Sequence, residues 1–203
     1  MKLYYSPGAC SLSPHIALRE AGIEVELVRV DLATKITEHG DEYRKVNPAG
    51  YVPCLVLDDG RQLTEGPAIL QYVADRAPER NLAPPAGSFE RYQLQQWLNF
   101  ISTEVHKSYS PLFNPAASDD WKAAARNNLA ARLALVAERL NGQPYLLGTR
   151  FSVADIYLFV TLSWAAYVNV DLSAWPSLAR LSADVGARPG VQAALKAEGL
   201  IKG

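Results

Sequence analysis

The sequence predicts an α/β region followed by an all-helical region, and three observations support this division. The first third alternates short strand-like segments with amphipathic helical ones. Asp59-Gly60 separates two of the short segments, as at the turn of a β-hairpin. Beyond a proline-rich stretch at residues 78–87, no further segment has the two-residue period of a strand.

The first third contains the expected elements of one small mixed sheet. In order, these are a strand at residues 2–5, a helix at 11–21 ended by Gly22, a strand at 25–30, a hairpin formed by 54–57 and 61–63, and a helix at 66–76. A strand-helix-strand start makes the first two strands parallel, and the hairpin adds an antiparallel pair. This order is the ground plan of a thioredoxin-like α/β domain.

The rest of the chain is expected to be helical. The predicted helices cover residues 88–110, 118–140, 152–168, 176–187 and 191–200. We therefore predict a thioredoxin-like domain at residues 1–80, a linker at 81–87 and an all-helical domain at 88–203.

Composition excludes several functional classes. The 203 residues carry a formal net charge of −1, so no general attraction to nucleic acid or to an anionic membrane is expected. No apolar run is long enough to span a membrane, and the first residues lack the apolar core of a signal peptide, so the expected location is the cytoplasm. Three scattered histidines and two cysteines show no metal-ligand spacing, and we predict no metal site.

The two cysteines differ in their expected environments. Cys10 lies just beyond the first strand, near the start of the first helix, where unpaired amides and the helix dipole favour a thiolate. The alternative is a small buried side chain. Cys54 follows Pro53 inside a predicted strand, where packing is the better interpretation.

Two further segments have both a functional and a structural interpretation. Val52 precedes Pro53 and is therefore held extended, either to pair with a bound peptide backbone or simply to start a strand after Gly50. Glu65 and Gly66 open a helix whose free amides suit a carboxylate, although plain helix capping also explains them.

The helical region adds candidates that usually serve as core. The helix at 88–110 has one apolar stripe, with Asn99, Thr103 and His106 on roughly the opposite side. Ser152 and Asp155 form a capping box, which we interpret as structural. The aromatic and apolar side chains that could line a pocket are Tyr109, Phe113 and, on one helical face, Trp164, Tyr167 and Val168.

Five segments, in order and correctly spaced, resemble the bacterial beta class of the soluble glutathione transferases. They are YYSPGACSLSPHIALRE, VNPAGYVPCLVLDDG, LTEGPAI, WLNFISTEVHK and FSVADIYLF. The resemblance covers essentially the whole chain and is greatest to members encoded with biphenyl-degradation enzymes. It implies the glutathione transferase fold, and an enzyme that conjugates reduced glutathione to apolar electrophiles such as chlorinated aromatics.

The resemblance also implies partners and site residues. It implies a cytoplasmic homodimer that uses glutathione as co-substrate in detoxification and xenobiotic degradation, without a permanently bound cofactor. A cis Val52-Pro53 bond is implied, and Gly66 stands where many members have serine. The implied catalytic residues are Cys10 and His106. The implied glutathione contacts are Cys10, Lys35, Val52, Pro53, Glu65, Gly66, Asn99, Thr103, Glu104, His106 and Lys107, some of them contributed across the dimer.

Two other functions stay open on the sequence. Cys10 could serve a glutathione-dependent thiol oxidoreductase or a reductive dehalogenase, although Ser13 excludes a Cys-x-x-Cys dithiol mechanism. A non-catalytic binding module of the same fold is the third hypothesis. The presence of Cys10, Val52-Pro53, Glu65, Asn99 and His106 argues against that module.

Overall fold

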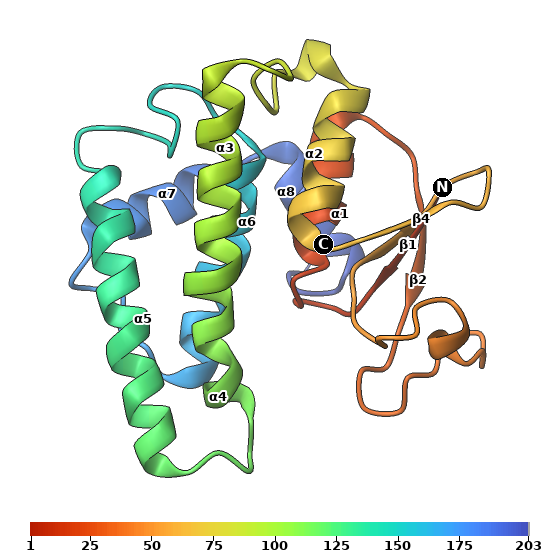
Figure 1. Ribbon diagram of the computed structural model, residues 1–203, viewed down its shortest axis with the longest axis horizontal. Helices are drawn as coiled ribbons and strands as arrows, with labels where there is room; N and C mark the ends of the chain where they lie inside the picture. Colours follow the sequence, from red (N-terminus) through yellow and green to blue (C-terminus); the bar gives the residue numbers. More distant parts are fainter. Residues whose placement is uncertain (203) are drawn as a thin grey trace. The chain divides into compact units, whose positions relative to one another are not determined.

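The computed structural model describes residues 1–202 and divides into two compact units. One unit contains Met1–Leu82 together with the C-terminal segment that begins at Arg188, and the other is Ala83–Ala187 (Figure 1). The sequence-based division placed all residues from 88 to 203 in the helical domain. The C-terminal segment instead packs with the first unit, because helix α8 (Pro189–Ala197) lies against helix α1 (Leu12–Ala21).

The first unit is built on a four-stranded mixed sheet. Its strands are β1 (Lys2–Tyr5), β2 (Glu26–Arg29), β3 (Cys54–Val56) and β4 (Gln62–Thr64), in the spatial order β2-β1-β3-β4. β1 is parallel to β2 and antiparallel to β3, and β3 and β4 form the hairpin. The predicted pairing is confirmed, and α1, α2 (Gly66–Arg76) and α8 lie on one side of the strands in Figure 1.

Helix α1 is almost wholly buried, and buried polar groups attach the C-terminal segment to it. Gly22 ends the helix in the left-handed conformation with φ of 68°, as predicted. His15 and Glu198 both have fully buried side chains, with 2.8 Å between His15 Nδ1 and Glu198 Oε1. The other Glu198 oxygen accepts a 2.9 Å hydrogen bond from the Gly8 backbone N–H. Glu198 therefore connects the C-terminal segment to both α1 and the turn before it.

The second unit is a bundle of helices. Its α-helices are α3 (Phe89–Phe100), α4 (Ser110–Phe113), α5 (Asp119–Arg139), α6 (Val153–Ser163) and α7 (Pro176–Gly186) (Figure 1). Ser88 and Ser118 cap α3 and α5 by accepting from the backbone N–H three residues later. In residues 1–202, no helix combines the length and apolar character needed to cross a membrane.

The predicted helix at 88–110 is one helical run with an irregular middle. After α3, a π-helix spans Ile101–His106 and a 3-10 helix spans Lys107–Tyr109 before α4 continues the run. The run also passes Pro111, at which the sequence analysis ended it. Pro111 has no N–H to donate, and it lies just after the 3-10 helix, where the α-helical pattern begins again in α4.

Asp155 anchors the start of α6. Its buried carboxylate accepts from the backbone N–H of Ser152 (2.9 Å), the Ser152 hydroxyl (2.9 Å) and the backbone N–H of Leu146 (2.8 Å). Burial is the largest influence on this carboxyl and raises its pKa to about 6, while the three donors act in the opposite direction. The group therefore joins the start of α6 to the loop that precedes it.

We expect Asp155→Ala to lower the free energy of unfolding by about 1 kcal/mol or more, because it removes the cap and leaves two buried N–H groups unpaired. Urea unfolding measures this change. Asp155→Asn is the matched control, because it keeps an acceptor oxygen and should lose less. An unchanged urea midpoint for Asp155→Ala would contradict this role.

Candidate active site

Cys10 lies in the turn between β1 and α1, two residues before the helix. It is half-buried, and its thiol donates a 3.2 Å hydrogen bond to the carbonyl oxygen of Val52. The amides of Leu12 and Ser13 donate to the carbonyls of Ala9 and Cys10 within the turn. The sequence predicted that unpaired amides at the start of this helix stabilise the thiolate. This is wrong for the Leu12 and Ser13 amides, because both are already paired within the turn.

The Val52-Pro53 peptide bond is cis, as the resemblance implied. Two side chains hold the chain just before it, since the Tyr43 hydroxyl and the Asn47 amide each donate to the Tyr51 carbonyl at 2.7 Å. Tyr43 is fully buried and Asn47 is nearly so. The loop that brings Val52 to Cys10 is thus fixed by buried polar contacts.

Glu65 and Gly66 lie beside this turn across the hairpin. The register pairs Cys54 with Thr64, so Pro53 and Glu65 leave the sheet at the same end. Glu65 has a backbone φ of +66°. Residues other than glycine rarely adopt this conformation, and those that do are often found at functional sites. Its side chain is exposed and makes no cap for α2, so capping does not explain this residue.

Lys35 is placed at the same end of the sheet through the loop that contains Tyr51. Its ammonium lies 5.8 Å from the centre of the Tyr51 ring, and its backbone φ is +61°. Tyr51 directly precedes Val52. The first unit therefore brings together all six of its predicted glutathione contacts at one end of the sheet.

Cys54 belongs to the core under this site. It is fully buried in a cluster with Val30, Tyr43 and Val52. Burial raises the pKa of its thiol to about 11, so the sulfur carries its proton at neutral pH. These properties agree with the predicted packing role.

In the second unit, the predicted polar residues follow the helical run around the π-helix. Asn99, Thr103 and Lys107 are exposed, while the Glu104 carboxylate forms an ion pair with Arg132 at 2.7 Å. The apolar stripe lies on the buried side of the run at Leu94, Leu98, Ile101 and Val105.

His106 is held between two aromatic residues. Its Nδ1 atom lies 2.7 Å from the Tyr157 hydroxyl, and the Trp164 ring lies edge-on, with ring centres 4.8 Å apart. Burial, followed by the positive charge of Lys107, lowers the pKa of His106 to about 4. The imidazole is therefore neutral at pH 7, which leaves hydrogen bonding as its means of stabilising an anion.

Three of the predicted pocket residues meet beside His106. Tyr109 stacks on Phe113 with ring centres 6.2 Å apart, and Trp164 packs edge-on against both. Val168 is buried as well, whereas Tyr167 is 73% exposed. Trp164, Tyr167 and Val168 were predicted to share one helical face, but Tyr167 differs from the other two in its exposure. These residues form a 3-10 helix after α6 ends at Ser163.

The Tyr109 hydroxyl is buried and has no hydrogen-bond partner among residues 1–202. Because an unpaired buried hydroxyl is costly, we expect Tyr109→Phe to raise the free energy of unfolding of the free protein by about 1 kcal/mol. Thermal unfolding without added ligand measures this change. Tyr92→Phe, at an exposed tyrosine, is the control, and destabilisation by Tyr109→Phe would show that the hydroxyl has a partner in the free protein.

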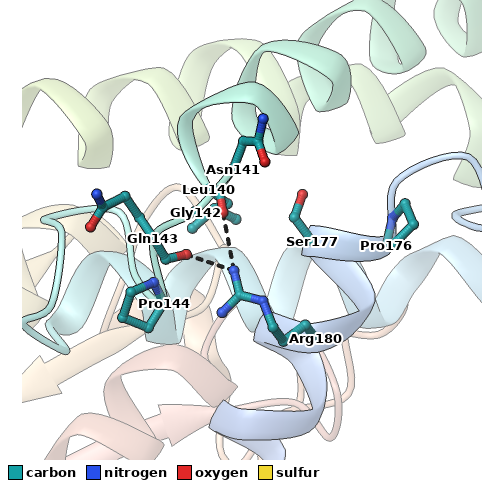
Figure 2. A pocket seen from close by; sticks show the side chains of 8 residues that line it. All are labelled: Leu140, Asn141, Gly142, Gln143, Pro144, Pro176, Ser177 and Arg180. Atoms are coloured by element: carbon teal, nitrogen blue, oxygen red, sulfur yellow. Dashed lines mark hydrogen bonds between the residues drawn. The ribbon is translucent and has the colours of Figure 1, made fainter.

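A hollow of about 610 Å³ lies at the end of α5, but it contains none of the predicted site residues (Figure 2). One guanidinium nitrogen of Arg180 donates to the carbonyls of Leu140 and Gln143. Ser177 donates to the carbonyl of Ala137. These contacts satisfy the carbonyls at the end of α5, and we interpret the hollow as part of helix packing.

Three residues that support the site were not predicted from the sequence: Tyr43, Asn47 and Tyr157. Tyr157 was detectable because it lies seven residues before Trp164, which places it on the same face of the predicted helix as that aromatic residue. Residues 1–202 contain no group of three or more His, Cys, Asp or Glu side chains that could hold a metal ion.

Comparisons with known proteins agree with this geometry. Residues 8–76 match the model of the glutathione S-transferase N-terminal domain, and residues 119–197 match that of the C-terminal domain. The glutathione S-transferase GstA of Escherichia coli O157:H7 is 48% identical over 98% of this chain and 100% of its own length.

Two solved structures are also similar over nearly the full length. The ternary complex of BphK, a bacterial GST, is 70% identical with a TM-score of 0.97, covering 98% of this chain and 100% of its own. A sphingomonad glutathione S-transferase complexed with glutathione is 53% identical with a TM-score of 0.96, covering 99% and 100%. The chain belongs to the glutathione S-transferase family, and its motifs and fold agree with the bacterial beta class.

Proposed function

We propose that this transferase conjugates reduced glutathione to apolar electrophiles, with chlorinated aromatics among them, at the turn that carries Cys10. The observation that carries the proposal is the 3.2 Å contact of the Cys10 thiol with the Val52 carbonyl, beside the cis Val52-Pro53 bond. The similar sphingomonad protein complexed with glutathione supports the choice of thiol substrate.

Glutathione offers chemical groups that match the first unit. Its extended backbone can pair with Val52 as a short antiparallel strand would. Its γ-glutamyl end has an ammonium group for the Glu65 carboxylate and a carboxylate for the Gly66 N–H at the start of α2. Pro67 has no N–H, and the Ala68 N–H donates to the Glu65 carbonyl. The glycine carboxylate suits the ammonium of Lys35. In this arrangement the sulfur of glutathione lies beside Cys10.

The reaction we propose is attack by the glutathione thiolate on an electrophilic carbon. The sulfur electron pair forms the new S–C bond, a chloride leaves with the electrons of its own bond, and the thiol proton passes to water. A free thiol ordinarily has a pKa near 8.5, so stabilising the thiolate increases the reactive fraction at neutral pH. We assign this stabilisation to a hydrogen bond from neutral His106 and to the charge of Lys107. Tyr109, Phe113, Trp164, Tyr167 and Val168 would receive the electrophile.

A second function uses Cys10 itself. Its half-buried thiol could act together with glutathione on a halogenated substrate. The carbon–halogen bond is replaced by a carbon–hydrogen bond and the halide leaves, while the two thiols supply the two electrons and end as a mixed disulfide of Cys10 and glutathione. Cys10→Ala separates the two functions, because conjugation through glutathione does not require a second sulfur. Conjugation preserved with dehalogenation or disulfide exchange lost would assign Cys10 to redox chemistry.

The test of the main function is a steady-state assay against a panel of chlorinated aromatics. We expect product formation that saturates with glutathione and releases one chloride for each glutathione consumed. The second-domain residues we place in the site can be tested in the same assay with Lys107→Ala and Asn99→Ala. No glutathione-dependent product with any member of the panel would contradict the proposed substrate class.

We also propose that the enzyme acts as a cytoplasmic homodimer in detoxification and xenobiotic degradation. Phe89 and Tyr92 on α3 are 73% and 59% exposed, and such aromatic side chains are typical of surfaces that a second copy covers. Light scattering of the wild type and of a Phe89→Asp variant tests the dimer. A monomeric wild type would contradict it.

A further inference from the structure

We propose that Tyr157 is a positioning residue for His106. In this role its hydroxyl donates to Nδ1 and fixes the imidazole in the tautomer that carries its proton on Nε2. As far as it concerns catalysis, this inference rests on the proposed function of His106 in stabilising the glutathione thiolate. As a statement about the tautomer, it stands on the contacts of the second unit alone.

The contact between the two residues is short and protected. The Tyr157 hydroxyl and His106 Nδ1 are 2.7 Å apart, and only 2% of Tyr157 is exposed. Its neighbours in α6, Ile156 and Leu158, are buried and apolar. The rings also meet edge-on, at 85° with centres 6.0 Å apart. A tyrosine in so apolar a helix needs a partner for its hydroxyl, and His106 supplies one.

The direction of the hydrogen bond follows from the charge states. His106 is neutral at pH 7 because of its burial, so one ring nitrogen carries a proton and the other accepts. A phenol ordinarily keeps its proton until about pH 10 and is a better donor than a neutral imidazole N–H. The phenol therefore donates, Nδ1 accepts, and the imidazole proton lies on Nε2.

The surroundings of His106 leave Nε2 as the ring nitrogen that can form a hydrogen bond with a ligand. Trp164 packs edge-on against the ring, at 68° with centres 4.8 Å apart, and Tyr157 occupies Nδ1. Among residues 1–202, Nε2 has no hydrogen-bond partner. A thiolate accepts from N–H donors and cannot bond to a bare ring nitrogen, so only the Nε2–H tautomer can stabilise it at this position.

The same charge state defines what His106 does. An imidazole with a pKa of about 4 is a weak base and would take a proton poorly from a thiol that titrates near 8.5. Donation from Nε2–H transfers no proton. Tyr157 therefore contributes by keeping a donor, instead of an acceptor, available on the imidazole.

The direct test is nitrogen-15 NMR of the His106 ring at pH 7. In the wild type we expect Nε2 to give the protonated signature and Nδ1 the unprotonated one. In Tyr157→Phe, which keeps the ring and loses only the hydroxyl, we expect a mixture of tautomers. Thr161→Val is the matched control, because it removes a buried hydroxyl from α6 that bonds to the Leu158 carbonyl. A proton on Nδ1 in the wild type, or unchanged signals in Tyr157→Phe, would overturn the proposal.

The kinetic test is a double-variant cycle with His106→Ala. We expect Tyr157→Phe to lower kcat for conjugation about tenfold, as for the loss of one hydrogen bond in the transition state, and to cause no further loss in the His106→Ala background. A loss of equal size in both backgrounds would mean that Tyr157 acts on stability and not through His106. If His106→Ala keeps full activity, the proposed function of His106 fails, and the NMR result still decides the tautomer.

Discussion

Glu198→Ala is expected to lower the free energy of unfolding by about 3–5 kcal/mol. Glu198 and His15 both have fully buried side chains, so removing the carboxylate leaves the imidazole without its partner in the interior. The substitution also leaves the Gly8 N–H without its 2.9 Å acceptor. Both losses separate the C-terminal segment from α1 and from the turn before Cys10.

Urea unfolding at neutral pH measures this effect, with Glu24→Ala as the control. Glu24 is an exposed glutamate of the same unit, so its substitution should change stability by less than about 0.5 kcal/mol. Glu198→Gln keeps an acceptor and should lie between the two. A Glu198→Ala variant as stable as the control would show that the buried pair does not hold the C-terminal segment.

The second large effect is a loss of stability in acid that depends on His106. Its pKa of about 4 in the folded protein is below its ordinary value of 6.5, because burial opposes the charged form. As the pH falls from 6.5 to 4, His106 becomes protonated in the unfolded chain but stays mostly neutral in the folded chain. Above pH 6.5 His106 is neutral in both states and costs no stability. Between pH 6.5 and pH 4 the folded state should lose about 3 kcal/mol of stability through this group alone.

His106→Phe isolates this contribution, because phenylalanine keeps an aromatic ring and does not titrate. We expect the stability of the variant to fall about 3 kcal/mol less than that of the wild type between pH 6.5 and 4. His39→Asn provides a control at an exposed histidine of the first unit. Parallel pH profiles for the wild type and His106→Phe would mean that His106 titrates normally in the folded chain.

The elements of the first unit were predictable because local signals specify them. Gly22 ends α1 in the left-handed conformation, and Asp59-Gly60 lies in the loop that joins β3 to β4. The end of the sheet that carries Cys10, Val52 and Glu65 follows from this order of strands. The cis bond before Pro53 came from the resemblance to a family, and no local signal in the residues gave it.

The features that escaped prediction depend on contacts distant in sequence or on small changes of helical geometry. Nothing near Glu198 indicates that its carboxylate reaches His15, so the C-terminal segment was placed with the helical domain. The π-helix at Ile101–His106 alters which residues share a face, and the sequence period alone does not reveal it. Tyr157 was overlooked because its partner, His106, lies 51 residues earlier.

The most direct test of the central claim is calorimetric titration of reduced glutathione into the wild type, Glu65→Gln and the control Glu79→Gln. Glu65 combines an exposed carboxylate with a strained backbone beside the Cys10 turn, whereas Glu79 is an exposed glutamate of the 3-10 helix Pro78–Arg80. We predict saturable binding to the wild type and to Glu79→Gln, and binding at least tenfold weaker to Glu65→Gln, because a charged partner of the γ-glutamyl ammonium is lost. Equal affinity in all three proteins, or no binding to the wild type, would contradict the proposed glutathione site.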